Sequence, residues 1–245
     1  MKPTLLIKIL FVLPAVLLTL SGWAQHSVFN WNLLGTNSNR LEGKLTGTTY
    51  YIPPLDSKQH FYYDGWQQGT VVLEDGDIFS GLQMNYLSKG DELVVYNPNL
   101  RQLFLADKEK VESCTVHFAQ TEHKFVKLYL EGFWGGNHYF RVLYSGTKQL
   151  LAYHYVFEEK TRMYTDEHGN RRGVRLVPKT IYYIYSPDSG FKILKKKRSS
   201  FVRLFPEEKR EVRRIFRRNN LRNFNETEMI EAFKLLDEAG FFNRL

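Results

Sequence analysis

Short apolar segments bounded by turn residues follow one another from Gly69 to Lys195, and this pattern restricts the chain to a fold rich in β-structure. Asp75-Gly76 lies between two such segments, and Asp-Gly between apolar runs is a strong β-hairpin signal. Pleated strands favour aromatic residues, and the chain contains 18 Phe and 15 Tyr. The expected strands are Thr70–Leu73, Ile78–Tyr86, Glu92–Tyr96, Arg101–Leu105, Val111–Phe118, Lys124–Leu130, Tyr139–Ser145, Lys148–Phe157, Thr180–Tyr185 and Phe191–Lys195.

The expected strands fall into two sets, and we therefore predict an α+β protein, mostly antiparallel β, with two small sheet or barrel-like units. The first unit spans residues 65–118 and holds five short strands, and the second spans residues 122–204. Residues 25–64 are predicted to be an irregular lead-in with one strand near Lys44–Ile52, because polar stretches and a Pro-Pro pair break regular structure. The charged segment Thr165–Arg175 is predicted to be an exposed loop.

The last part of the chain, residues 205–245, changes to helical periodicity and predicts an αα-hairpin. Pro206 suits the first position of a helix whose apolar residues cluster on one arc. A second helix is expected to begin at Asn225, because Glu228 follows at the spacing of a capping box. Gly240 is a suitable residue to end it.

The first 24 residues have the order of a secretory signal peptide. Lys2 and Lys8 precede the apolar run Ile9–Leu20, and the small residues Gly22 and Ala24 follow it. The run is shorter than the roughly 20 residues that a membrane-spanning helix needs. We therefore expect cleavage between Ala24 and Gln25, no transmembrane segment afterwards, and export to the periplasm or the periplasmic face of the outer membrane, with the extracellular space as an alternative.

Positive charge is concentrated in one stretch. Residues 192–222 hold 13 basic and 3 acidic side chains, whereas residues 25–191 hold 17 basic and 18 acidic ones. Such a surface suits an anionic membrane or an acidic envelope protein, and export disfavours nucleic acid as the partner. The candidate binding residues are Lys196, Lys197, Arg198, Arg210, Arg213, Arg214, Arg217 and Arg218.

The alternative for this stretch is a solvated helix face without a ligand. In that case its arginines would be partly paired with the acidic residues of the final helix, Glu231, Asp237 and Glu238.

A single cysteine, Cys114, excludes an intrachain disulfide. Strand alternation places Cys114, Val116 and Phe118 on one face of the segment Val111–Phe118. Free cysteines are usually buried, and we therefore predict a buried structural thiol.

No catalytic motif stands out, and no cofactor is expected. There is no Gly-x-Ser-x-Gly nucleophile elbow and no His-Glu-x-x-His arrangement. The densest group of potential metal ligands is His117, Glu122, His123 and His138, and adjacent strands could bring its three histidines to a zinc site. Their spacing is not diagnostic, so they are weak candidates.

The order of parts resembles a group of uncharacterised exported proteins of Gram-negative bacteria. The resemblance rests on Gly69–Gly76, Gly81–Tyr86, Lys179–Tyr185, Gly190–Lys195 and the Phe-Pro helix start in Leu204–Lys209. It implies a β-rich body with a C-terminal helical hairpin. No activity is assigned to that group, and no functional residue is carried over from it.

The expected function is therefore that of a non-catalytic envelope protein that binds a partner or a surface through its basic helix. Two alternatives stay open. One is a metal-dependent or other hydrolase that uses the histidines, and the other is a carrier of a small apolar ligand in an aromatic-lined β cavity, which needs a cavity of about 300 Å³ or more.

Overall fold

The computed structural model describes residues 28–30, 44–52, 61–97, 101–132, 135–165, 169 and 171–244, with the backbone alone at residues 28–30 and 172. The expected signal peptide, residues 1–24, and its cleavage site lie outside the described residues. The strands are β1 (Val28–Asn30), β2 (Thr46–Tyr50), β3 (Gln67–Leu73), β4 (Ile78–Leu87), β5 (Glu92–Asn97), β6 (Gln102–Ala106), β7 (Val111–Phe118), β8 (Thr121–Leu130), β9 (Gly136–Ser145), β10 (Gln149–Thr165), β11 (Arg171–Ser186) and β12 (Gly190–Leu194). The helices are α2 (Arg198–Leu204), α3 (Lys209–Arg218), α4 (Glu226–Glu238) and the 3₁₀ helix η1 (Phe241–Arg244).

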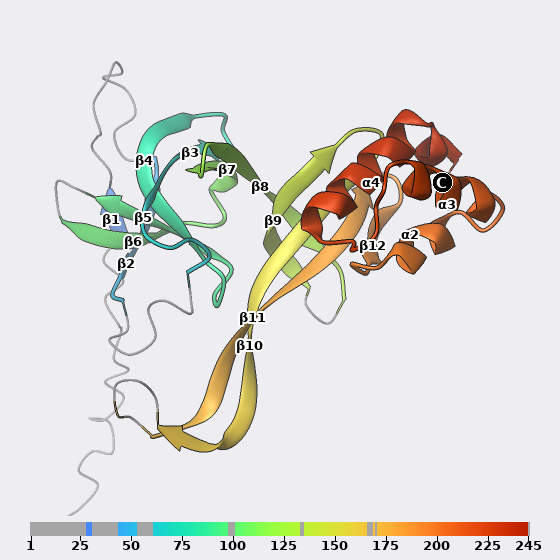
Figure 1. Cartoon of the computed structure of the whole chain (residues 1–245). Coiled ribbons are helices and arrows are strands. Elements are labelled where there is room, and N and C mark those ends of the chain that lie inside the picture. Colours follow the sequence, from blue (N-terminus) through green and yellow to red (C-terminus); the bar gives the residue numbers. More distant parts are fainter. Residues whose placement is uncertain are drawn as a thin grey trace, which may run out of the picture.

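The twelve described strands form one antiparallel sheet with the order β1-β2-β6-β5-β4-β3-β7-β8-β9-β10-β11-β12 (Figure 1). A mostly antiparallel β fold with a C-terminal helical part is thus confirmed. The division into two sheet units is not confirmed, because β7 pairs with β8 from Ser113↔Val126 to Phe118↔Thr121 and so joins the two ranges. Their connection uses Ala119 and Gln120, both at positive φ as a type I′ turn requires, although neither residue is a typical sign of that turn.

The strands of the first half lie where the alternation predicts them, at β3 to β7, and β2 confirms the strand expected in the lead-in. Cys114 in β7 is buried, as are its neighbours Val71 and Phe125. Burial raises the pKa of the Cys114 thiol to about 12, which makes it a structural and unreactive side chain.

The strands β10 and β11 are much longer than predicted, and the prediction of a loop over Thr165–Arg175 is wrong in part. Residues 171–175 belong to β11, where Arg175 pairs with Glu159 of β10. Beyond Ala152, where pairing with β9 ends, the described parts of β10 and β11 pair with each other as a two-stranded arm (Figure 1). Cross-strand hydrogen bonding overrides the polar composition that favoured a loop.

The second β unit was predicted to extend over residues 122–204, and its C-terminal end is wrong. Residues 198–204 form the helix α2 instead of continuing the sheet. Phe201, Val202 and Phe205 then face the core at helical spacing. The helix α3 begins at Lys209 and not at Pro206, with Glu208 as its N-cap residue.

The start of the last helix is confirmed. Asn225 is the N-cap of α4, and its side-chain oxygen accepts a hydrogen bond from the Glu228 backbone N–H at 2.8 Å. The Glu228 carboxylate accepts from the backbone N–H groups of Asn223 and Phe224, both at 2.9 Å. These bonds hold the connection between α3 and α4 in place.

The helices cover one face of the sheet at its β9–β12 end (Figure 1). Strand alternation sends Leu150, Ala152, Tyr182, Ile184 and Leu194 to that face, where they form one core with the helices. The residues between them, including Leu151, Tyr153, Tyr183 and Phe191, point to the opposite face and form a second apolar cluster. Both faces of this part of the sheet are therefore apolar, and the helical layer covers one of them.

Candidate anion-binding pocket

The eight basic residues predicted as a binding site all lie in or beside the first two helices of the C-terminal layer. Lys196 and Lys197 precede α2, and Arg198 is its first residue. The other five belong to α3: Arg210, Arg213, Arg214, Arg217 and Arg218.

A hollow of about 700 Å³ lies between α2 and α3 and brings three of the eight together, namely Arg198, Arg213 and Arg217. Two further cations, Arg203 and Lys209, also line it and were missed. Lys209 lies four residues before Arg213, so helical spacing could have found it. Arg203 could be found only by predicting the helix α2. The sequence signal for that helix is the spacing of its buried apolar residues.

The remaining predicted residues, Lys196, Lys197, Arg210, Arg214 and Arg218, do not line this hollow. The cations of α3 therefore form two rows at four-residue spacing. The pocket row consists of Lys209, Arg213 and Arg217, and the outer row consists of Arg210, Arg214 and Arg218. Successive members of a row lie about 6 Å apart along the helix axis.

The walls of the pocket rest on an aromatic core. The rings of Phe201 from α2, Phe216 from α3 and Phe224 from the following loop contact one another, with centroids 5.3–6.0 Å apart. All three side chains are buried. The separation of α2 and α3 is therefore set by packing and does not depend on a ligand.

Arg198, which lines the pocket, bonds to α3. Its Nη2 donates to the backbone carbonyl of Arg213 at 3.1 Å, and its guanidinium lies 5.9 Å from the centre of the Phe216 ring. These two contacts orient the Arg198 guanidinium without a ligand.

Asp237 and Glu238 of α4 have partners elsewhere, so the ion pairs with the α3 arginines that the solvated-face alternative included are not formed among the described residues. The Asp237 carboxylate accepts from the Tyr144 hydroxyl and the Thr147 backbone N–H, at 3.0 and 3.1 Å. Glu238 lies 3.9 Å from Lys234. Among the described residues, no carboxylate oxygen lies within 4.0 Å of a side-chain nitrogen of α3, and Glu231 forms no ion pair.

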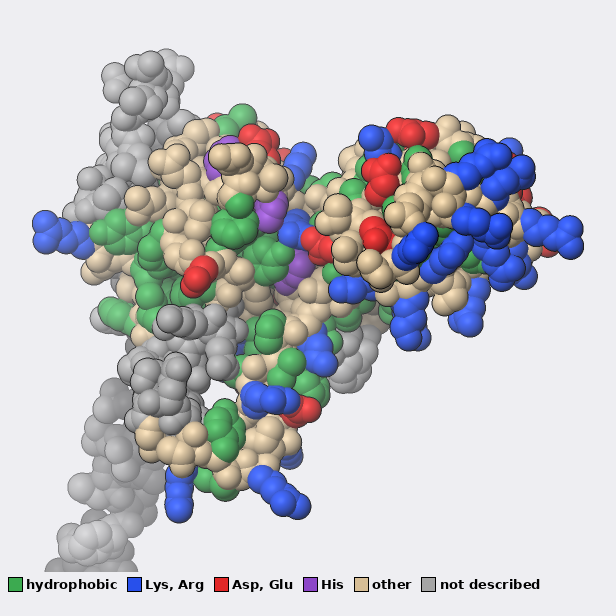
Figure 2. Space-filling view, in the orientation of Figure 1, with side chains coloured by type: hydrophobic (Ala, Val, Ile, Leu, Met, Phe, Trp, Pro, Cys, Tyr) green, Lys and Arg blue, Asp and Glu red, His purple; other side chains and the backbone are tan. Residues whose placement is uncertain are grey.

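The basic side chains of the helical layer gather at one end of the molecule (Figure 2). Like charges four residues apart on a helix repel each other by a few tenths of a kcal/mol per pair. The chain therefore tolerates a small loss of stability at this end, and an anion bound there would relieve it.

Comparison with models of known protein families, with curated proteins and with solved structures finds no match for this chain. The geometry and chemistry of the described residues therefore carry the functional proposal. In the described part of the chain, no helix is both long and apolar enough to span a membrane.

The three weak metal candidates are not brought together. His123 Nδ1 lies 2.8 Å from the Tyr63 hydroxyl, and His138 Nδ1 lies 2.8 Å from the Asp91 carboxylate. His117 lies 3.6 Å from Glu122 near the β7–β8 turn. No group of three His, Cys, Asp or Glu side chains within the described ranges could hold a metal ion, because the strand register gives each histidine a different partner.

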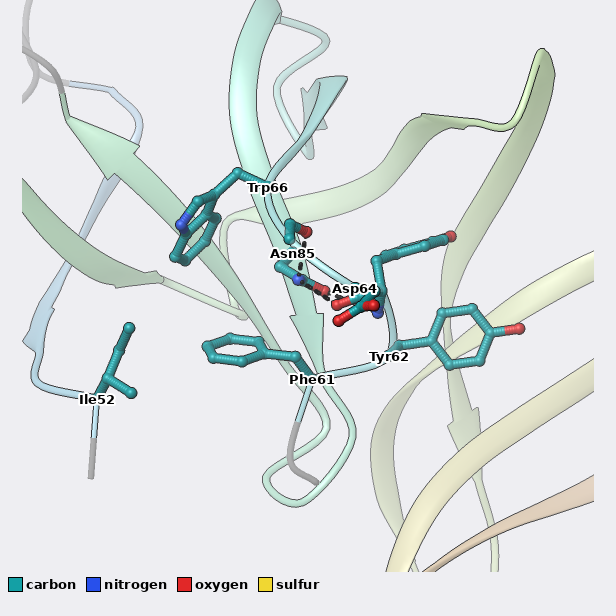
Figure 3. A pocket seen from close by; sticks show the side chains of 8 residues that line it. Ile52, Phe61, Tyr62, Asp64, Trp66 and Asn85 are labelled. Atoms are coloured by element: carbon teal, nitrogen blue, oxygen red, sulfur yellow. Dashed lines mark hydrogen bonds between the residues drawn. The ribbon is translucent and has the colours of Figure 1, made fainter. Parts of the chain in front are cut away.

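A hollow of about 410 Å³ lies beside the start of β3 (Figure 3). Ile52, Phe61 and Trp66 gather on one side, and Asn85 lies at its back (Figure 3). The Asn85 amide donates to the carbonyls of Tyr63 and Gly65, and its oxygen accepts from the Tyr63 backbone N–H. These bonds hold the turn, which leaves this amide little capacity for a ligand.

A third hollow, of about 600 Å³, lies on the face of the sheet opposite the helices. It is lined mainly by aromatic and aliphatic side chains from β8, β11 and β12, among them Tyr129, Tyr185, Phe191 and Ile193. The strands β8 and β12 are four positions apart in the sheet, so the sheet must curl to bring them to one hollow.

Proposed function

We propose that the protein is an exported, non-catalytic binding module of the cell envelope. In this proposal α2 and α3 attach the β-sheet body to an anionic membrane surface that faces the periplasm. The observation that carries the proposal is the pocket between these helices, which five cations line without a described carboxylate partner.

The charge distribution supports a surface role. Each Lys or Arg near an anionic membrane contributes about 1 kcal/mol to binding. The helical end places its cations on two adjacent helices, and the rest of the chain after the signal segment is nearly neutral. The body would therefore be held at the surface by one end.

Fractionation of a Gram-negative host that expresses the full chain tests export and attachment together. We expect a product that begins at Gln25 and sediments with membranes at low salt. Salt at 1 M should release it, because the Debye length then falls to about 3 Å. The variant R210E/R214E/R217E should appear in the soluble periplasmic fraction.

A matched control is K124E/K160E/K179E, which changes the same charge at exposed positions outside the helices. It should sediment like the parent protein. Recovery of the parent in the soluble periplasmic fraction at low salt would refute attachment, and a cytoplasmic product that retains Met1 would refute export. Loss of sedimentation after protease treatment of the membranes would point to an acidic envelope protein as the partner.

A second candidate function, a carrier of a small apolar ligand, is favoured by the aromatic hollow on the opposite face. Its volume of about 600 Å³ lies within the range of small-molecule sites. The neutral fluorescent probe N-phenyl-1-naphthylamine should bind saturably to the purified protein. The substitutions Tyr129→Asp and Ile193→Asp, at largely exposed positions, should weaken it about tenfold.

Ile78→Asp provides the control, because Ile78 is equally exposed but lies in β4 outside the hollow. An unsaturable fluorescence signal, or an equal effect of the control, would exclude a defined site for apolar ligands on this face.

A further inference from the structure

The pocket between α2 and α3 differs from a uniformly basic helix surface because its cations come from two elements and face one space. Arg198 and Arg203 lie on α2, and the pocket row Lys209, Arg213 and Arg217 lies on α3. A surface that attracts anions only through its net charge would not need this convergence. The arrangement is that of a site for one anionic group.

Four of the five cations are arginines. A guanidinium is planar and carries five N–H donors in a fixed fork, which matches the oxygens of phosphate better than an ammonium does. Arg198 is already oriented by its bond to the Arg213 carbonyl and by the Phe216 ring. The Ser199 hydroxyl, which also lines the pocket, adds a neutral donor.

The charge balance favours an anion with more than one negative charge. A phosphomonoester carries a charge of about −1.5 to −2 at pH 7 and has three terminal oxygens. A carboxylate has fewer oxygens and a single charge, and it would leave more of the five cations without a partner. The hollow of about 700 Å³ is also larger than a phosphate group, so it has room for the group that carries the phosphate.

We infer that this pocket binds one phosphomonoester group, the chemistry of a phosphorylated lipid headgroup at the membrane surface. This inference rests on the proposed attachment to an anionic membrane, and it adds that one saturable site lies on the α2–α3 side of the basic end. The outer row then contributes only through its general charge.

The two rows of α3 provide a matched test. Each of two variants removes three positive charges from exposed positions of the same helix. The pocket-row variant is K209Q/R213Q/R217Q, and the outer-row variant is R210Q/R214Q/R218Q. Binding of the purified protein is measured on vesicles that contain phosphatidic acid, a monoester, or phosphatidylglycerol, a diester, at equal surface charge.

We expect the parent protein to prefer phosphatidic acid. The pocket-row variant should lose more than about tenfold in affinity for these vesicles, and the outer-row variant should lose less than about threefold. Arg203→Gln removes a pocket cation that lies on α2, and it should also reduce the preference for phosphatidic acid. This result does not depend on the folding of the α3 variants. Soluble glycerol 3-phosphate distinguishes a lipid headgroup from a free phosphomonoester as the source of the phosphate. If the protein bound it saturably and as tightly as it binds the vesicles, the ligand would be a soluble phosphate.

An equal loss in the two rows, or equal affinity for the two lipids, would overturn the pocket inference and leave the membrane proposal standing. Failure of the parent to bind any anionic vesicle would instead overturn the proposed function.

Discussion

Replacement of Arg141 by Met is expected to lower the free energy of unfolding by about 1.5–3 kcal/mol. Arg141 lies in the middle of β9, and its residue surface is only 5% exposed. Its Nη1 donates to the Tyr62 hydroxyl at 2.6 Å, and its Nη2 contacts the Glu226 carboxylate. The substitution keeps most of the volume but leaves these partners without their cation.

The loss is large because this network connects β9 to three other parts of the fold. Tyr62 precedes β3, and Glu226 is the first residue of α4. The Tyr182 hydroxyl of β11 donates to the second oxygen of Glu226 at 3.1 Å. The Glu226 side chain that is left without its cation is 35% exposed, so the loss is that of charge-assisted hydrogen bonds, about 1.5–3 kcal/mol. Whole domains are stable by only about 5–15 kcal/mol.

Urea denaturation of the purified variants provides the measurement. Arg175→Met is the control, because Arg175 forms an ion pair with Glu159 on the arm, where both side chains are about half exposed or more. It should cost less than about 1 kcal/mol. Equal effects of the two substitutions would show that the Arg141 network does not hold α4 to the sheet. A double-mutant cycle with Glu226→Gln should give a coupling of at least about 1 kcal/mol.

His154 is expected to make the protein sensitive to acid. Its residue surface is 5% exposed, its Nδ1 bonds the Thr180 hydroxyl at 2.9 Å, and its ring lies 4.3 Å from the Tyr62 ring centroid. Burial lowers the pKa of His154 from 6.5 to about 3, and the Arg141 cation, together with His123 when it is protonated, adds to this effect. The folded state therefore keeps His154 neutral at pH values where the unfolded chain is protonated.

The sign of the dependence follows from proton uptake. Between pH 6.5 and about 3 the unfolded state binds one more proton at His154 than the folded state does. The free energy of unfolding should then fall by about 1.4 kcal/mol for each pH unit below 6.5. Burial also lowers the pKa of His123, which adds a smaller loss in the same direction.

His154→Gln should reduce this slope by about 1.4 kcal/mol per pH unit between pH 6 and pH 4, because glutamine does not titrate. The midpoints of urea unfolding at several pH values measure the slope, and the interval from pH 7 to pH 8 is the internal control. There the curves of the parent and the variant should run parallel. Identical slopes below pH 6 would show that His154 is protonated in the folded protein.

The strands of the first half were predictable because their signals are local. Alternation and an Asp-Gly turn lie within a few residues of one another, and β3 to β7 appear where these signals place them. The N-cap at Asn225 was predictable for the same reason, since its hydrogen bond closes over three residues. The buried state of Cys114 followed from alternation along β7.

The errors occur where distant residues decide the local conformation. The stretch after Leu194 has apolar residues that suit either a strand or a helix, and packing of Phe201 on Phe216 and Phe224 selects α2. The polar segment Thr165–Arg175 suggested a loop, yet pairing between β10 and β11 extends the ladder into it. In the first case the deciding contacts come from later elements of the chain, and in the second they are cross-strand pairs such as Thr165↔Arg171, which composition alone does not reveal.

The sequence by itself determined the β-rich class, the helical end, the concentration of positive charge in residues 192–222 and the expectation of export. All of these depend on composition or on short-range spacing. Only the tertiary structure decided that the described strands form one sheet, that Arg203 and Lys209 join Arg198, Arg213 and Arg217 around one pocket, and that Glu226 and Asp237 of α4 bind residues of the sheet and its turns. The physical reason is that a pocket is made by side chains from separate elements, whose positions are set by the packing of the helices on each other and on the sheet.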